Sequence, residues 1–198
     1  MNLDRFYPIF DHPDWLETML PLGVKLVQMR IKEMAPDDVR AALARSKQLC
    51  DAAGAVMVVN DYWQTAIDLG CDWVHLGQED LDNADIPALR RARIKLGIST
   101  HDVDELERAL ALNPDYIALG PVYPTILKKM KWTEQGLDRV REWKQKIGSL
   151  PLVGIGGMTI ARADGVYAAG ADIVAVVTDI TLNTDPAARL SAWLAATR

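Results

Sequence analysis

Several features that would assign a chain to a membrane, secreted or nucleic-acid-binding class are missing from this sequence. It has only 2 cysteines, Cys50 and Cys71, which are not spaced like metal ligands, and we expect both to be reduced and buried. No apolar run approaches the length of a membrane span, and the first residues do not follow the basic-then-apolar order of a signal peptide. Basic residues are fewer than acidic ones, 22 against 27, which argues against non-specific nucleic-acid binding. We therefore expect a cytoplasmic protein that binds small molecules, whose oligomeric state the composition leaves open.

The 198 residues contain no linker or low-complexity segment, and a hydrophobic content of 49% predicts one domain over residues 1–198. Short β-branched runs alternate with segments in which apolar residues recur every three to four positions. The expected strands are 6–10, 26–29, 56–59, 73–76, 95–98, 116–119, 152–155 and 173–177. The expected helices are 15–22, 36–53, 62–69, 86–94, 103–111, 137–147, 161–169 and 186–196.

Strict alternation of strand and helix requires parallel strands joined by right-handed crossovers, and eight such units predict a single-domain (β/α)8 barrel, the TIM barrel of the α/β class. A doubly wound open sheet is the alternative. It would usually carry a glycine-rich turn after the first strand, where this chain has residues 11–14, Asp-His-Pro-Asp.

Turn and capping residues support these boundaries. Pro36 followed by two acids is typical of a first helical turn, and Asp102 with Glu105 resembles a capping box. We expect four glycines to mark returns from helix to strand: Gly54, Gly70, Gly97 and Gly170.

Two acidic residues follow two consecutive strands. The run 56–59 stops at Asn60-Asp61, and the run 73–76 is followed by a turn that ends at Asp80. Parallel neighbouring strands lie about 4.8 Å apart, so the two carboxylates should emerge side by side and could share one Mg²⁺ ion. The alternative is that Asp61 only caps the next helix. His75, at the end of the second of these strands, is expected to be a packed, hydrogen-bonded residue.

Basic residues lie at the same edge. Gln28, Arg30 and Lys32 alternate with apolar residues and so share one face of an extended segment, unless they are merely solvated charges at a strand end. Cations beside a Mg²⁺ site indicate a bridging anion such as a diphosphate. Ser99 adds a hydroxyl after the fifth strand, where a helix start is an equal alternative.

A second anion site is predicted on the other side of the barrel mouth. The seventh strand ends in Gly154-Ile155-Gly156-Gly157 and the eighth in Val177-Thr178, the positions at which barrels of this kind bind phosphate. The segment 120–151 is the longest connection after a strand and is the candidate lid or substrate loop; it begins with a basic stretch that includes Lys128.

In their joint order these motifs resemble the thiamine phosphate synthase family, (β/α)8 enzymes of thiamine biosynthesis. The resemblance covers nearly the whole chain and rests on residues 27–32, 59–61, 74–80, 97–99, 120–125 with Lys128, 154–157 and 176–178. It implies that Asp61 and Asp80 bind Mg²⁺ and that Arg30, Lys32, Lys128 and Ser99 are catalytic. The substrate-binding residues it implies are Gln28, Met29, Arg30, Ile31, Lys32, Asn60 and Ser99 toward a pyrimidine diphosphate, and Thr125, Ile126, Leu127, Lys128, Gly157, Val177 and Thr178 toward a thiazole phosphate.

The reaction implied by the resemblance is a transfer that couples 4-amino-2-methyl-5-pyrimidinylmethyl diphosphate with a (carboxy)thiazole phosphate, giving thiamine phosphate and diphosphate with the help of Mg²⁺. No strand end offers a nucleophile beside a base, so a covalent intermediate is not expected. A dissociative route fits the residues, and a concerted displacement stays open. Two other functions remain as alternatives: a thiazole tautomerase or regulator, and a non-catalytic phosphate-binding barrel with some of the 6 tryptophans at an interface.

The chain departs from the family pattern at Leu127, where a threonine is common, and at Thr178-Asp179, where a serine and a small residue are common.

A threonine hydroxyl at position 127 could donate to the thiazole phosphate, and a hydrogen bond to a charged group contributes about 1.5–3 kcal/mol. We therefore expect Leu127→Thr to tighten thiazole phosphate binding roughly tenfold, with KM for the pyrimidine diphosphate unchanged. Titration of thiazole phosphate into both proteins measures this. Unchanged or weaker affinity would show that another group already satisfies the phosphate.

Overall fold

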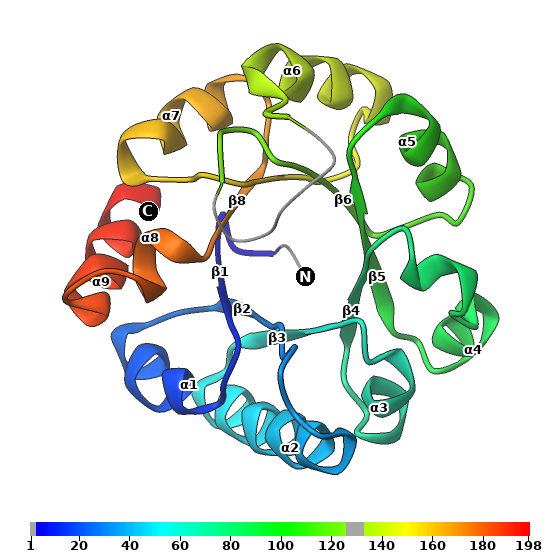
Figure 1. Ribbon diagram of the computed structural model, residues 1–198, viewed down its shortest axis with the longest axis vertical. Coiled ribbons are helices and arrows are strands. Elements are labelled where there is room, and N and C mark those ends of the chain that lie inside the picture. The colour runs from blue at the N-terminus through cyan, green and yellow to red at the C-terminus, as the bar shows by residue number, and fades with distance from the viewer. Residues whose placement is uncertain (1–2, 126–132) are drawn as a thin grey trace.

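Eight parallel strands close into a barrel that the helices surround (Figure 1). The computed structural model describes residues 3–125 and 133–198. Each strand pairs in parallel with the next, and the eighth pairs with the first, so the closed barrel is confirmed and the open sheet is wrong. The strands are β1 (Phe6–Phe10), β2 (Leu26–Met29), β3 (Val56–Asn60), β4 (Trp73–Leu76), β5 (Lys95–Thr100), β6 (Tyr116–Leu119), β7 (Leu152–Ile155) and β8 (Ile173–Val176).

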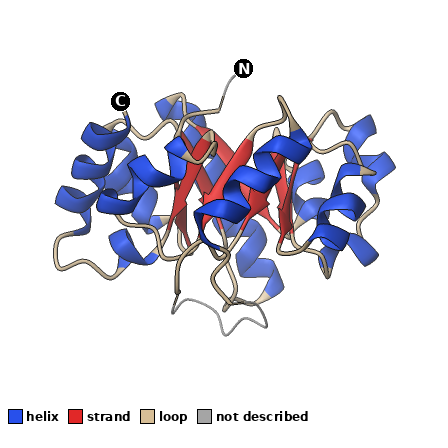
Figure 2. Cartoon of the chain, turned by 90° about the horizontal axis from the view of Figure 1, so that it is seen from above, coloured by secondary structure: helices blue, strands red, loops and turns tan. Residues whose placement is uncertain are grey.

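Helices follow the strands as the periodicity predicts, and Figure 2 shows them flanking the central strands. They are α1 (Asp14–Met19), α2 (Pro36–Ala53), α3 (Trp63–Asp68), α4 (Ile86–Arg91), α5 (Val103–Leu110), α6 (Gly136–Ile147), α7 (Ile160–Ala168), α8 (Thr178–Thr181) and α9 (Pro186–Thr197). Two short 3-10 turns, η1 (Leu20–Leu22) and η2 (Asp80–Asp82), complete the elements. The sequence did not predict α8 or η2, because each is a single turn too short to show a helical period.

Side chains alternate along each strand between two apolar layers. Residues such as Leu26, Val58 and Val153 fill the barrel interior, whereas their neighbours Val27 and Val59 pack outward against the helices. Tyrosine and tryptophan are part of this packing. Trp143 and Trp193 are fully buried, Trp73 lies in the inner layer, and Trp15 and Trp63 pack against the outer core. Core packing therefore accounts for these five tryptophans, and Trp132 lies outside the described residues.

The two cysteines are free and buried, as expected. Burial raises the pKa of the Cys50 thiol to about 12 and that of Cys71 to about 11. Neither thiol is therefore ionised near neutral pH. Within residues 3–125 and 133–198, no helix combines the length and apolar character needed to cross a membrane.

The predicted helix start at Asp102 is half correct. The Asp102 side chain accepts a hydrogen bond from the backbone N–H of Glu105 at 2.9 Å. The Glu105 carboxylate does not reach back to Asp102; it accepts from the backbone N–H of His101 at 2.8 Å and contacts Nδ1 of the same histidine at 2.7 Å. Glu105 thus orients a histidine at the rim of the barrel.

Gly97 does not mark a return from helix to strand, so that prediction is wrong. Gly54, Gly70 and Gly170 do lie at such returns, but Gly97 lies inside β5, in register with Tyr116 of β6. A Cβ atom on Gly97 would lie 2.0 Å from Cζ of Tyr116. The absence of a side chain at position 97 therefore makes room for the Tyr116 ring inside the barrel.

We expect Gly97→Ala to destabilise the protein by about 1–3 kcal/mol or more, because overpacking a well-filled core forces side chains and backbone to shift. Denaturant unfolding measures the change. Gly165→Ala is the matched control, since its Cβ would meet Leu137 at an ordinary 3.5 Å and lies in α7, where alanine favours the helix. Equal stability of the two variants would contradict the steric role of Gly97.

Candidate active site

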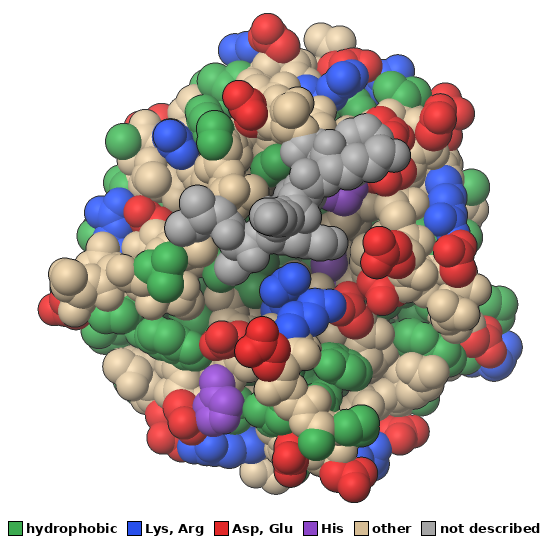
Figure 3. All heavy atoms as spheres, viewed as in Figure 1, with side chains coloured by type: hydrophobic (Ala, Val, Ile, Leu, Met, Phe, Trp, Pro, Cys, Tyr) green, Lys and Arg blue, Asp and Glu red, His purple; other side chains and the backbone are tan. Residues whose placement is uncertain are grey.

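A cavity of about 530 Å³ opens where the strands end, and Figure 3 looks onto this face, where basic side chains lie beside acidic ones. Every second side chain of a strand points into the barrel, and the last such side chain of β2, β3 and β4 is polar. Gln28 lies two positions after the buried Leu26, Asn60 two after Val58, and His75 two after Trp73. Most of the predicted site residues line this single cavity, namely Gln28, Arg30, Lys32, Asn60, Asp61, Asp80, Ser99, Thr125 and Val177.

The two predicted carboxylates lie side by side. Asp61 has a φ of 66°, in the left-handed region that few residues other than glycine adopt, and its backbone N–H donates to the carbonyl of His75 at 3.0 Å. Asp80 accepts from the backbone N–H of Gly77 at 2.9 Å. Burial raises the pKa of the Asp80 carboxyl, and the adjacent Asp61 carboxylate raises it further. Helix α3 begins after Tyr62 without a side-chain cap, so the alternative that Asp61 caps this helix is wrong.

This acid pair fits Mg²⁺. Among the residues that the structure describes, no three His, Cys, Asp or Glu side chains gather as a metal site. Two carboxylates leave most coordination positions to water and substrate oxygens, which is the usual arrangement for Mg²⁺ with phosphate ligands.

The two cations beside the acids have different partners. Lys32 forms an ion pair with Asp61. No described carboxylate forms an ion pair with Arg30, which faces the same cavity. Arg30 also lines a second hollow of about 390 Å³, next to Val177 and Thr178. A guanidinium in this position can bind an anion with two parallel hydrogen bonds.

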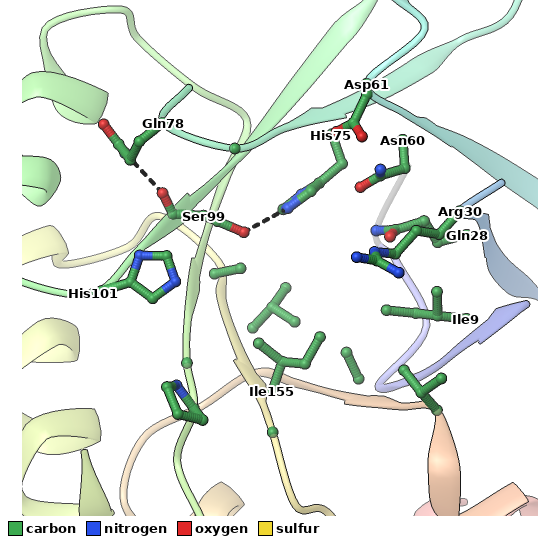
Figure 4. A pocket seen from close by; sticks show the side chains of 18 of the residues that line it. Ile9, Gln28, Arg30, Asn60, Asp61, His75, Gln78, Ser99, His101 and Ile155 are labelled. Carbon is green, nitrogen blue, oxygen red and sulfur yellow. Dashed lines mark hydrogen bonds between the residues drawn. The ribbon is translucent and has the colours of Figure 1, made fainter. Parts of the chain in front are cut away.

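A chain of buried hydrogen bonds crosses the barrel below the cavity. The Gln28 amide nitrogen donates to the Tyr7 hydroxyl at 2.9 Å, and this hydroxyl lies 3.1 Å from that of Tyr116. The Tyr116 hydroxyl lies 2.8 Å from His75 Nδ1, and His75 Nε2 lies 2.8 Å from Ser99 Oγ (Figure 4). Burial lowers the pKa of His75 to about 4, against an opposing effect of the Asp61 carboxylate and with a smaller contribution from the Arg30 charge. His75 is therefore a neutral, packed and hydrogen-bonded residue, as predicted.

Sequence reasoning missed Tyr7, Tyr116 and Gln78. Both tyrosines lie within apolar runs, and only their place on the inward face of β1 and β6 would have revealed them. The Gln78 amide nitrogen donates to the Ser99 carbonyl at 2.8 Å and so ties the turn that carries Asp80 to the end of β5 (Figure 4). The amide oxygen of Gln78 is buried without a hydrogen-bond partner among the described residues.

The glycines after β7 have a steric role. A Cβ on Gly156 would lie 2.6 Å from Cα of Pro121, and one on Gly157 would lie 2.4 Å from the carbonyl oxygen of Pro124. Both residues have positive φ, 101° and 60°. Close packing against the loop after β6 therefore requires both glycines. Gly156 lines the cavity and Gly157 does not, so phosphate binding by Gly157 stays a prediction.

The departure at Thr178-Asp179 also has a structural reason. The Asp179 carboxylate accepts hydrogen bonds from Arg189 at 2.8 and 3.0 Å and from the indole N–H of Trp193 at 2.7 Å. Asp179 thus fastens α8 to α9, and the arginine balances its charge.

Of the predicted residues that the structure describes, four do not line the cavity. The side chains of Met29 and Ile31 are buried in the outer core, so only their backbone is left for the predicted substrate binding. Thr178 lines the second hollow. Gly157 packs against the neighbouring loop, as described above. Ile126, Leu127 and Lys128, with part of the candidate lid, lie outside the described residues.

Comparisons with known proteins agree in one family. A family model described as thiamine monophosphate synthase matches residues 6–180. A thiamine-phosphate synthase of Rhizobium etli is 58% identical over 197 residues, covering 100% of this chain and 97% of that protein. Its counterpart in Neisseria meningitidis serogroup A is 40% identical, covering 96% of this chain and 93% of that protein. A solved thiamine phosphate pyrophosphorylase of Pyrococcus furiosus has a TM-score of 0.86 at 25% identity, covering 98% of this chain and 95% of that one.

Because the pKa of His75 is lowered in the folded state, we expect the free energy of unfolding to depend on this residue at acidic pH. The unfolded state takes up this proton near pH 6.5 and the folded state only near pH 4, so His75 costs stability as the pH falls through this window, up to about 3 kcal/mol. Urea unfolding between pH 7 and 4 should show a shallower loss in His75→Gln than in the wild type. His12→Gln, at a partly exposed histidine outside the buried chain, is the control and should follow the wild type. Parallel curves for all three proteins would contradict the assignment.

Proposed function

The chain belongs to the thiamine monophosphate synthase family, and we propose that it joins 4-amino-2-methyl-5-pyrimidinylmethyl diphosphate to a (carboxy)thiazole phosphate and releases diphosphate. Family membership makes it a transferase of thiamine biosynthesis. The observation that carries the substrate proposal is one cavity with a paired carboxylate site at Asp61 and Asp80 and a guanidinium, Arg30, that no described carboxylate neutralises.

The bond between the pyrimidine methylene carbon and the diphosphate oxygen breaks, and its electron pair leaves with the diphosphate. The thiazole nitrogen then forms the new bond to the same carbon and becomes positively charged. We favour the dissociative order, because the polar groups of the cavity address charge on a leaving group and the pyrimidine amino group can donate into the cation that remains.

Arg30 and Lys32 bind the diphosphate and stabilise the negative charge that grows on it. Lys32 exchanges its ion pair with Asp61 for one with the diphosphate, which frees the Asp61 carboxylate for the metal. When bound by Asp61 and Asp80, Mg²⁺ would supply further neutralisation of the leaving group. Lys128 is proposed to reach the same diphosphate.

The two alternative functions fit the molecule less well. A tautomerase has no use for a paired carboxylate site beside two cations. A binding barrel with tryptophans at an interface is not supported, because the five described tryptophans pack in or against the core.

Asp61→Asn tests the metal assignment. Asparagine keeps the shape and tolerates the left-handed backbone at this position, so the fold should survive while one ligand charge is lost. We expect turnover to fall about a hundredfold, the effect of one preorganised contact worth roughly 3 kcal/mol. The measurement is diphosphate release at saturating Mg²⁺, with each substrate omitted in turn.

Asp104→Asn, at an exposed acid of α5, is the control for loss of one negative charge. Near-wild-type turnover in Asp61→Asn would rule out the metal role of Asp61. Diphosphate release that does not require the thiazole phosphate would count against the proposed transfer.

A further inference from the structure

The buried chain from Gln28 to Ser99 has a direction that its hydroxyl groups determine. A tyrosine hydroxyl has one proton to donate. With the Gln28 amide donating to Tyr7, the arrangement in which each hydroxyl donates to the next group sends the Tyr7 proton to the Tyr116 hydroxyl at 3.1 Å, a contact in which either oxygen can donate. The Tyr116 proton is then directed to Nδ1 of His75 at 2.8 Å.

This order fixes the tautomer of His75. Because Nδ1 accepts from Tyr116, the single proton of the neutral imidazole resides on Nε2, which lies 2.8 Å from Ser99 Oγ. Nε2 therefore donates to Ser99. The serine hydroxyl uses a lone pair in this bond and keeps its own proton for a partner in the cavity that it lines.

The orientation of the Gln28 amide decides between this order and its reverse. If the amide were turned over, its oxygen would accept a hydrogen bond from Tyr7. Donor and acceptor would then exchange in every hydrogen bond of the chain, and the Ser99 hydroxyl would donate to Nε2 of His75. Gln28 lies in β2 and Arg30 directly follows this strand, and both side chains line the same cavity (Figure 4). A neighbouring guanidinium favours the arrangement in which the amide oxygen faces the cation and the NH₂ group faces Tyr7.

We propose that Tyr7, Tyr116 and His75 are positioning residues that hold Ser99 as a hydrogen-bond donor toward an anionic oxygen of the substrate. The link to turnover rests on the proposed function, whereas the proton order is a property of the protein alone. Tyr7 and Tyr116 are buried and His75 nearly so, so the chain is set before any ligand enters. Donors oriented in advance stabilise a developing negative charge without reorganising during the reaction.

The first test reads the proton order directly and needs no activity. The chain has only 3 histidines, so ¹⁵N-histidine labelling and long-range ¹H–¹⁵N spectra of the ligand-free protein at pH 7 resolve each ring. We expect His75 as the neutral Nε2–H tautomer. The Nδ1–H tautomer would reverse the chain and overturn the proposal, even if the transfer reaction is confirmed.

The second test asks whether the chain acts through Ser99. We expect Ser99→Ala to lower kcat about tenfold or more, as for loss of a hydrogen bond to a charged group. Tyr116→Phe keeps the ring that Gly97 accommodates and removes the donor to His75, so it should lower kcat several-fold while KM for the thiazole phosphate is unchanged. In the Ser99→Ala background the same substitution should have no further effect.

Tyr167→Phe is the matched control, because it removes a hydroxyl that donates to the Arg5 carbonyl at 2.8 Å, away from the cavity. Equal losses from Tyr116→Phe with and without Ser99 would show a merely structural role and overturn the proposal. A wild-type protein with the Nε2–H tautomer but no diphosphate release would instead refute the proposed function alone.

Discussion

The hydrogen bonds that satisfy buried polar groups inside the barrel are the constraint on which the rest of the site depends. A closed parallel barrel turns every second side chain of each strand into a space that excludes bulk water, and a polar group left unpaired there costs about 1–3 kcal/mol. Tyr7, Tyr116 and His75 meet this requirement for one another. Because the chain ends at Gln28 and Ser99, the need to satisfy the interior also fixes the floor of the cavity.

The charged residues lie above this buried chain and, unlike it, are open to solvent. The acids and cations at the strand ends are only partly buried, and the Lys32–Asp61 pair joins the loops after β2 and β3. An ion pair of this kind contributes little to stability. In the proposed reaction, the pair keeps the Lys32 ammonium close to the diphosphate and the Asp61 carboxylate close to the metal ion. The buried hydrogen-bond chain and the partly exposed charges above it together suit the proposed reaction, in which positive and negative charge separate within one cavity.

Much of this could be predicted from the sequence, because the signals are periodic. The β-branched runs predicted the strands to within two residues, and the acids in the loops after two of them, Asp61 and Asp80, were expected side by side and are found so. Residues whose role depends on a distant partner could not be predicted. Gly97 was expected at a turn because its conflict with the Tyr116 ring arises only across a pair of strands. Asp179 was noted only as a departure, since its partners Arg189 and Trp193 lie in the following helix.

The contact between Gly97 and Tyr116 also limits the order in which this barrel can change during evolution. The tyrosine ring occupies the space in which any side chain at position 97 would lie. A smaller residue can replace Tyr116 while Gly97 is unchanged, but a side chain gained at position 97 while the ring is present carries the destabilisation expected for Gly97→Ala. The two positions therefore diverge at lower cost if residue 116 changes first. A change of residue 116 removes the tyrosine hydroxyl from the buried chain. A protein that depends on this chain therefore keeps Tyr116, and the tyrosine ring in turn favours glycine at position 97.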